Sequence, residues 1–470
     1  VMKKIIIAVI FFCVTVSCND FVDVIPKGNT IPETVDDLAK LMTCGSMSSP
    51  LYTFSDISYS IQYFEFYSDD YTAIENPNTS NYDSYSTLPI FQNTLKWADY
   101  IYASAESDYN WDGLYKSNYV ANYVLDKVDV VEDGVAYDRN EVKGQALVHR
   151  AMNYFLLVNL YGKQYDAVTA STDLGVPLVL EADINKQYPR ATVAQVYERM
   201  LQDLNDAISL LKVDVPEYNN IPGKATAYAL RARYYLWQQN YDQAYADASE
   251  ALKLRGELID YNNCSLRVPG MIAAGVNGYE SIMQINPEIM YSRYRMSRSN
   301  CPFSSNMLAI IDTDNDLRYS LFYGAYEAAN IFDPMSWTRH VHSGINTSEV
   351  WLTKAEAALR KSQPDVSEAI EALDYVRCHR YVKATYQTTT ETNPDLLLIE
   401  ILNERRREIT FTEMAFLDRK RLNADPTTAR PMTRTVYGET YTLPVGDAHY
   451  QLAIPLNVME LNPQLIQNER

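Results

Sequence analysis

The stretch LWQQNYDQAYADASEALKL, from Leu236 to Leu254, predicts two antiparallel helices that pack closely against each other. Its Asn240-Tyr241-Asp242 segment is typical of a tight turn. The helix after the turn carries the small residues Ala244, Ala248 and Ala251 at helical spacing. Small residues in this pattern are typical of the contact between the two helices of a tetratricopeptide hairpin.

A second hairpin is predicted from Val350 to Arg380. Its turn is Ser362-Gln363-Pro364-Asp365, and the equivalents of the three alanines are Ala369, Leu373 and Val376. Stacked hairpins of this kind form a solenoid, which is a rigid scaffold for loops on one of its sides.

Helical periodicity extends over four more segments. These segments are Trp111 to Leu125, Glu141 to Leu160, Val193 to Leu211 and Ala225 to Gln239. We therefore predict a mostly α-helical fold, with tetratricopeptide-like hairpins within about residues 110–420.

Irregular stretches separate the predicted helices. Those at about residues 51–109, 256–322 and 383–397 are too long for ordinary connections, so we expect them to carry functional loops. Within the first, Ser58 to Tyr67 is predicted to form a short helix. No clean domain boundary is evident, and we treat residues 18–470 as a single domain.

The composition is acidic and rich in tyrosine. The 60 acidic residues outnumber the 41 basic ones among 470 residues, and the formal net charge is −19. Such a protein repels phosphate backbones, so nucleic acid is not an expected partner. The 38 tyrosines stand against 13 Phe and 5 Trp. Tyrosine suits the recognition of sugars or peptides, although packing between helices is the more common explanation for any one of them.

The amino terminus is typical of a bacterial lipoprotein signal peptide. Lys3-Lys4 precedes an almost unbroken apolar run from Ile5 to Val16, and Ser17-Cys18 follows. The run is shorter than the about 20 residues that cross a bilayer, so a permanent transmembrane helix is not expected. We predict that residues 1–17 are removed and that Cys18 is lipidated. Thr15 stands where such signals usually carry Leu, and an ordinary secreted protein is the alternative.

Motifs for catalysis and metal binding are sparse. The sequence has no HExxH, GxSxG, GxxxxGK[ST] or GxGxxG pattern. His340 and His342 alternate as strand residues on one face would, but a third zinc ligand is missing. No metal or cofactor is therefore expected. The remaining cysteines show no metal-ligand spacing, and a disulfide between any two of them stays open: Cys44, Cys264, Cys301 and Cys378.

Two charged runs have alternative explanations. The run from Asp312 to Asp316 resembles the start of a calcium loop, but Leu317 and Tyr323 stand where that loop needs Gly and Glu. Its carboxylates, like Asp69-Asp70, could also serve a glycosidase. The arginines at 405–407 lie among acidic residues at helical spacing, which predicts ion pairs within and between helices.

Four segments stand out, in order along the chain: CNDFVDVIPKG from Cys18 with the following T-x-x-D-L, EVKGQALVHRAMNYFLLVNLYG (Glu141 to Gly162), ERRREITFTEMAFLDRKRL (Glu404 to Leu422) and LAIPLNVMELNPQLIQN (Leu452 to Asn468). These segments resemble motifs of the SusD/RagB family of Bacteroidetes outer-membrane lipoproteins. The chain departs from the family pattern at Met414, Ala415-Phe416 and Val458, where packing rather than ligand chemistry is concerned.

The resemblance implies about four tetratricopeptide-like hairpins that support an irregular, loop-rich ligand-binding region. It also implies a function. Family members are anchored by lipid to the outer membrane, face the cell exterior and act as lids over a TonB-dependent, SusC-like transporter. They capture oligosaccharides, or peptides in some relatives, and pass them to the channel. In the family, the D-x-R pair at Asp316 and Arg318 forms a structural turn.

Candidate ligand-binding residues lie in two irregular segments that combine tyrosines with polar groups. Sugars stack on exposed aromatic rings and bond to carboxylates and Arg, so we expect these side chains to be exposed. The first segment carries Tyr67, Asp69, Asp70, Tyr71, Tyr82 and Tyr85; the second carries Tyr291, Arg293, Tyr294 and Arg295. The alternative for Tyr67 and Tyr71, four residues apart, is packing on a helix face.

Two classes of function remain open from the sequence. One is non-catalytic capture of glycans or peptides, and the other is a surface-anchored glycoside hydrolase or esterase. The missing nucleophile motifs favour capture, although paired carboxylates often leave no sequence signature.

The lipid anchor leads to a direct test. A fatty-acid analogue supplied to growing cells should label the wild-type protein, because Cys18 follows a short apolar run and a small residue. The Cys18→Ala variant should lose both the label and the membrane fraction, whereas Cys13→Ala should keep both. Label retained in Cys18→Ala would rule out this anchor.

Overall fold

The computed structural model describes ten stretches of the chain. They are residues 32–43, 67–72, 89–102, 106–263, 266–268, 271–272, 288–296, 303–319, 341–410 and 412–470. The fold over these stretches is mostly α-helical, with thirteen α-helices and sheets of only two strands each. The predicted fold class is therefore confirmed.

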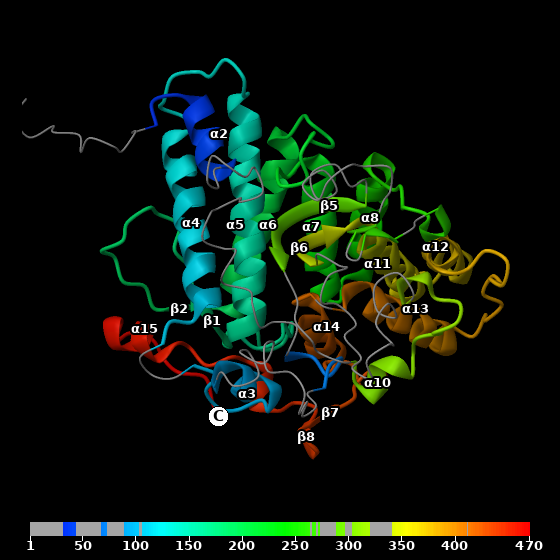
Figure 1. The fold of residues 1–470 in the computed structure, drawn as a ribbon. Helices are drawn as coiled ribbons and strands as arrows, with labels where there is room; N and C mark the ends of the chain where they lie inside the picture. The colour runs from blue at the N-terminus through cyan, green and yellow to red at the C-terminus, as the bar shows by residue number, and fades with distance from the viewer. Residues whose placement is uncertain are drawn as a thin grey trace, which may run out of the picture.

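The centre of the molecule is a succession of long helices, each packed on the next. Figure 1 shows this succession crossing the molecule from α4 to α12. The order is α4 (Tyr109–Lys127), α5 (Arg139–Tyr161), α6 (Val193–Leu210), α7 (Lys224–Trp237), α8 (Tyr241–Leu254), α11 (Thr347–Arg360) and α12 (Val366–Arg380), with α13 (Pro394–Ile409) packed mainly on α11. The helices expected from apolar periodicity are all present, with ends within a few residues of those predicted.

Polar side chains set where these helices begin. Asp108 and Asp138 accept hydrogen bonds from the first free N–H groups of α4 and α5. Thr192 and Gln195 form a reciprocal capping box at the start of α6. Asn393 caps α13, whose first residue is Pro394. The loop expected to run to Leu397 therefore ends at Asn393, because this cap and proline start the helix earlier.

The predicted hairpin between α7 and α8 is confirmed in detail. Gln239 adopts a left-handed conformation with φ 58°, and the Asn240 side chain accepts a hydrogen bond from the Gln243 N–H. Ala244, Ala248 and Ala251 are fully buried where α8 packs on α7 and α11. Since these three side chains end at Cβ, the helix backbones approach closely.

Short elements surround the long helices. Helix α2 (Val35–Thr43) packs on α4 and α5, and Figure 1 shows α3 (Pro89–Leu95), α15 (Leu456–Leu461) and the β7–β8 hairpin at the lower edge. The remaining short helices are α10 (Ser305–Leu308) and α14 (Met414–Leu422). The antiparallel pairs are β1 (Leu174–Pro177) with β2 (Arg190–Thr192), β3 (Leu266–Val268) with β4 (Met271–Ile272), β5 (Ile289–Met296) with β6 (Val341–Asn346), and β7 (Met432–Val436) with β8 (Glu439–Leu443).

The loop-rich inserts are only partly described. The helix expected from Ser58 to Tyr67 lies outside the described residues except for its last member. The insert at about 256–322 contains strands β3, β4 and β5 and helix α10.

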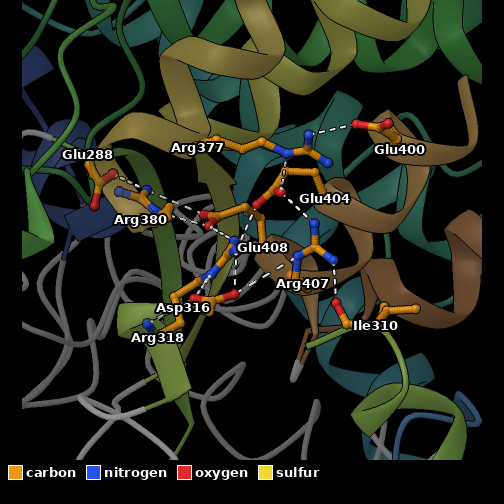
Figure 2. Close-up of polar contacts among 10 residues, drawn as sticks. All are labelled: Glu288, Ile310, Asp316, Arg318, Arg377, Arg380, Glu400, Glu404, Arg407 and Glu408. Carbon is orange, nitrogen blue, oxygen red and sulfur yellow. Dashed lines mark hydrogen bonds and ion pairs between the residues drawn. The ribbon is translucent and has the colours of Figure 1, made fainter. Parts of the chain in front are cut away.

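A buried ion network joins α13 to three other parts of the chain (Figure 2). Glu404 accepts hydrogen bonds from Arg318 at 2.7 Å, from Arg377 at 3.0 Å and from Arg407 at 2.5 Å. Glu408 accepts from Arg318 at 2.5 Å and from Arg380 at 2.8 Å. Arg380 also pairs with Glu288, the residue before β5. The ion pairs predicted for this arginine-rich run are confirmed.

The Asp312–Asp316 run is a turn that positions one partner of this network. The Asp312 carboxylate accepts hydrogen bonds from the N–H groups of Asp314 and Asn315, each at 3.2 Å. Asp316 holds the Arg318 guanidinium through two contacts at 2.8 Å. The structural explanation of the D-x-R pair is therefore supported, because its charges are paired with each other and with α13.

A second buried network ties α13 to α14, α11 and α7. Arg405 donates to Asp418 at 3.1 Å and to Glu349 at 3.1 Å, and Arg233 of α7 donates to the same Glu349 at 2.6 Å. Arg421 forms two contacts of 2.7 Å with Glu356. Each of these charges is paired, as burial in a region of low dielectric requires.

The arginines change the acidity of the buried carboxyls. Burial alone would raise the pKa of Glu408, but the charges of Arg380 and Arg318 outweigh it and lower the pKa to about 2. Burial would also raise the pKa of Glu404, but the charges of Arg407, Arg318 and Arg377 outweigh it. They hold this pKa well below its ordinary value. Both groups are therefore carboxylates throughout the physiological range.

The α7–α8 contact gives a stability test. Ala244→Trp should destabilise the protein by about 1–3 kcal/mol, because the indole cannot fit where the side chain is fully buried. Ala246→Trp is the matched control, since Ala246 is exposed on the same helix and should change stability by less than about 0.5 kcal/mol. Urea unfolding measures both. Equal stability of the two variants would contradict the packing described here.

The ion network gives a pH-dependent test. Glu408→Gln leaves Arg318 and Arg380 short of a negative charge, and a loss of about 3–5 kcal/mol is expected at pH 7. Because the folded pKa lies below the ordinary value of 4.5, the stabilisation is complete above about pH 4.5 and is lost as pH falls toward 2.

The urea midpoints of wild type and Glu408→Gln should therefore converge between pH 4.5 and pH 2. Glu250→Gln is the control, because Glu250 is a half-exposed residue of α8 and its loss should cost at most about 0.5 kcal/mol. A constant difference between wild type and Glu408→Gln across this pH range would contradict the role assigned to Glu408.

Candidate functional site

The first group of predicted ligand residues is buried. Tyr67, Asp69, Asp70 and Tyr71 are at most 2% exposed, so the expectation that they are exposed is wrong. The Tyr67 ring packs on Phe416 with ring centroids 5.4 Å apart. The Tyr71 hydroxyl lies 3.1 Å from the Thr410 hydroxyl. These tyrosines pack against α14 and the end of α13, as the alternative of packing predicted, but they do so from a turn and not from the face of an α-helix.

The two aspartates of this group form ion pairs with arginines distant in sequence. Arg406 Nε donates to Asp70 Oδ1 at 2.7 Å, across 336 residues of sequence. Arg430 Nη1 donates to Asp69 Oδ2 at 2.6 Å. Burial opposes the ionisation of Asp69, but Arg406 and Arg430 outweigh it and lower the pKa of this carboxyl. Both carboxylates therefore hold residues 67–72 against α13.

The second group lies along β5. Tyr291 is 1% exposed, and its hydroxyl lies 2.7 Å from His149 Nδ1 of α5, so its expected exposure is also wrong. Arg293, Tyr294 and Arg295 follow on the same strand, where Tyr294 pairs with Ser343 and Arg295 with His342 of β6. Their contact with a ligand stays a prediction. Tyr82, Tyr85 and Cys18 lie outside the described residues.

An aromatic cleft that the sequence reasoning missed lies beside α3. One wall is Trp97 to Tyr102, and the other is formed by Gln451 to Leu456 with His449 and Arg470. Tyr100 is 41% exposed there. The WADYIY segment belongs to the expected insert at about 51–109, and its density of aromatic residues was an available signal.

Trp97 anchors this wall. Its backbone has a left-handed φ of 51°, a strained conformation for a residue with a large side chain. The indole Nε1 donates to the Tyr67 carbonyl at 2.7 Å, and the Arg434 guanidinium lies 4.1 Å from the ring centroid. The cleft wall is therefore held from the inside, while Tyr100 remains accessible.

Polar groups surround the exposed tyrosine. The two ring nitrogens of His449 lie 2.8 Å from Asp99 Oδ1 and 2.6 Å from Asp447 Oδ1. Arg470 Nη1 donates to the Gln451 carbonyl at 2.6 Å. Burial lowers the pKa of Arg470 overall, although the neighbouring Tyr100, Asp99 and Asp447 oppose this shift. Arg470 and Asp99 therefore line the cleft together with Tyr100, and Asp447 holds His449 from outside this lining.

The deepest carboxyl of the cleft has a structural role. Burial raises the pKa of Asp108 to about 6, although hydrogen bonds from Tyr161, Trp111 and Asn110 oppose the shift. Asp108 caps α4 and accepts a hydrogen bond of 2.6 Å from the Tyr161 hydroxyl. Since these contacts use both carboxylate oxygens, Asp108 is not free to act on a ligand.

The two pockets beside these elements differ in volume. The aromatic cleft is shallow and encloses only ≈ 30 Å³. A cavity next to Asp69 and Asp70, between α13 and α14, has ≈ 220 Å³ and three arginines in its wall: Arg406, Arg419 and Arg430.

The described residues include no group of three or more His, Cys, Asp and Glu side chains placed to hold a metal ion. His342 lies on β6, and His340 is outside the described part of the chain. None of the helices in the described ranges has the length and apolar character needed to cross a bilayer.

Two family models match the sequence. The one described as "Starch-binding associating with outer membrane" matches residues 20–236, and the one described as "SusD family" matches residues 335–470. A search of curated proteins finds no match.

Solved structures share the fold. A SusD superfamily protein from Bacteroides thetaiotaomicron is 20% identical, with 93% of this chain and 98% of that chain covered at a TM-score of 0.67. A putative sugar binding protein from Bacteroides vulgatus is 21% identical, with 92% and 96% covered at 0.65. A SusD-like carbohydrate binding protein from the same species is 17% identical, with 92% and 95% covered at 0.64.

The family motifs, the helical scaffold and both family models agree along most of the chain. On these grounds the chain belongs to the SusD/RagB family.

Proposed function

We propose that this protein is a cell-surface lipoprotein that captures oligosaccharides and delivers them, without catalysis, to a TonB-dependent outer-membrane transporter. Membership of a family described as starch-binding and outer-membrane-associated supports the proposal. Two relatives of the same fold are described as a sugar binding protein and a carbohydrate binding protein.

The observation that carries the proposal is the aromatic cleft. Pyranose rings present flat C–H faces, which pack on aromatic rings, and hydroxyl groups at their edges, which need polar partners. Tyr100 offers the ring, and Asp99, His449 and Arg470 offer the polar partners on the same wall or the one opposite. Because the cleft is shallow, it suits one part of a longer glycan that continues along the surface.

Rigidity makes this cleft a better binding surface than its exposure alone implies. The Trp97 indole is fixed by the Tyr67 carbonyl and by Arg434, and Tyr67 is itself packed on Phe416 of α14. The wall that carries Tyr100 is therefore attached to the helical scaffold. A preformed surface loses little conformational entropy when a ligand binds.

The carboxyls in the cleft do not favour a glycoside hydrolase. Glycosidases need one carboxyl as acid and a second as base or nucleophile, both facing the ligand. Asp108 is occupied as a helix cap, and Asp99 lies against His449. Peptide capture is the remaining alternative, since tyrosine and charged groups also suit peptides.

Delivery to a transporter and a lipid anchor at Cys18 complete the proposal. Both rest on the family resemblance and on the residues before position 19. Affinity purification of the lipidated protein from outer membranes should recover a TonB-dependent transporter in defined stoichiometry. Purification of the Cys18→Ala protein from the same cells should not.

Binding through Tyr100 is tested by calorimetry against a panel of neutral oligosaccharides. Tyr100→Ala should weaken binding about threefold to tenfold, which is the contribution expected from one aromatic contact. Tyr119→Ala is the matched control, because Tyr119 on α4 is 40% exposed but does not line the cleft. Its affinity should equal that of the wild type.

Two outcomes would contradict the proposal. Equal affinities of the Tyr100→Ala and wild-type proteins would exclude the cleft as the sugar site. Shortened glycans after prolonged incubation with the purified protein would show hydrolysis instead of capture. Both variants should melt at the wild-type temperature, since neither ring is buried.

A further inference from the structure

The cavity between α13 and α14 is lined by an unusual set of charges. Arg406, Arg419 and Arg430 line it together with Asp69, Asp70 and Asp418. Equal numbers of each sign would make it neutral if all six charges acted on the cavity alone. The partners of the aspartates show that they do not.

Asp418 is neutralised from the protein interior. Its carboxylate accepts hydrogen bonds from Arg405 at 3.1 Å and from Arg421 at 2.8 Å. Burial opposes the ionisation of Asp418, but these two arginines outweigh it and lower its pKa. This carboxylate therefore belongs to the buried network that joins α13 and α14.

Asp69 and Asp70 are neutralised by two of the cavity arginines. Asp69 accepts from Arg406 at 3.2 Å and from Arg430 at 2.6 Å, and Asp70 accepts from Arg406 at 2.7 Å and from the Thr410 hydroxyl at 3.2 Å. Two positive and two negative charges cancel at this end of the cavity. One arginine is left.

Arg419 is that remaining arginine. It is 9% exposed, and over the stretches that the structure describes it forms no ion pair. Its Nη2 donates to the Thr428 carbonyl at 2.5 Å, while its Nε is buried without a hydrogen-bond partner among the described residues. Burial and the neighbouring Arg430 charge lower the pKa of Arg419 to about 10, so the guanidinium stays positive at neutral pH.

The rest of the cavity wall is aliphatic. Ile399 and Leu402 of α13 and Leu422 of α14 face the same space, and Ile399 is 52% exposed at its rim. No aromatic ring lines it among the described residues, so it lacks the surface on which a sugar stacks. Its volume of ≈ 220 Å³ is below the range of about 300–1,000 Å³ typical of drug-sized ligands.

We propose that this cavity binds the carboxylate of a small ligand with an aliphatic body, with Arg419 as the residue that receives the charge. A carboxylate would supply the opposite charge that Arg419 lacks, and guanidinium groups bind carboxylates through paired hydrogen bonds. The aliphatic body would cover Ile399, Leu402 and Leu422. The cavity and the aromatic cleft share no lining residue, so this proposal stands apart from the proposed glycan capture.

The test uses the purified full-length chain and three probes. N-acetyl-L-leucine carries a carboxylate on an aliphatic body, N-acetyl-L-leucinamide has the same body without the charge, and D-galacturonate has a carboxylate on a polar ring. Calorimetry should show saturable binding of N-acetyl-L-leucine that weakens with added salt, because the contact is between charges. The other two probes should bind at least about tenfold more weakly.

Two variants separate charge from space. Arg419→Met removes the guanidinium and leaves no described carboxylate unpaired, so the protein should fold, with N-acetyl-L-leucine bound roughly ten- to hundredfold more weakly. Ala429→Phe fills the cavity from the loop after α14 without changing an arginine, and it should abolish binding. The melting temperature of each variant checks its fold.

Any one of the following results would overturn the proposal. The first is the absence of saturable N-acetyl-L-leucine binding to the wild type. The second is equal binding of the acid and its amide, or unchanged affinity in a folded Arg419→Met protein. The third is tighter binding of galacturonate, which would contradict the aliphatic body. None of these results would bear on Tyr100, whose sugar binding is measured separately with neutral glycans.

Discussion

The fold depends on the burial of charges along one helix. Once α13 forms, Glu404, Arg405 and Glu408 project into the protein interior, where an unpaired charge is strongly unfavourable. Their partners come from segments far apart in the sequence: Asp316-Arg318, Glu349, Arg377, Arg380 and Asp418. All of these segments must arrive in one arrangement for every charge to be paired. Figure 2 shows four of these partners, Asp316, Arg318, Arg377 and Arg380, beside Glu404 and Glu408 of α13.

This constraint reaches the parts of the chain that surround the helical stack. Arg406 is on the side of α13 that faces residues 67–72, and its pairs with Asp69 and Asp70 hold that segment. Tyr67, in the same segment, accepts the hydrogen bond that fixes Trp97. A chain of contacts therefore runs from the α13 network to the wall of the aromatic cleft. The helices supply rigidity, and the connected segments supply the binding surface.

The same charge pairing also explains why the cavity beside α14 differs from its surroundings. Most buried arginines near α13 have a carboxylate partner. These pairs stabilise the networks, and the paired arginines have no unbalanced charge to attract a ligand. At Arg419 the pairing stops within the described chain, because the nearby aspartates are already occupied. The proposed carboxylate site is therefore built around Arg419, the cavity arginine that has no ion-pair partner among the described residues.

The sequence by itself determined the helices. The signals that form them act within a few residues of one another, so each helix can be predicted from its own local sequence. These signals are the apolar spacing, the alanines of α8 and the capping residues Asn240, Asp365 and Asn393. It also indicated that the arginines of α13 form ion pairs, because acidic residues share their helical faces. It did not indicate which distant residues complete those pairs.

Only the tertiary structure decided which tyrosines are covered. Tyr67, Tyr71 and Tyr291 resemble Tyr100 in their local surroundings, yet three are buried and one is exposed. The difference arises from α5, α13 and α14, which pack over the first three from more than a hundred residues away in the sequence. Burial is a long-range property of the folded chain, whereas helical periodicity is a short-range one. The sequence therefore determined the scaffold, and the packing of that scaffold decided where a ligand has access.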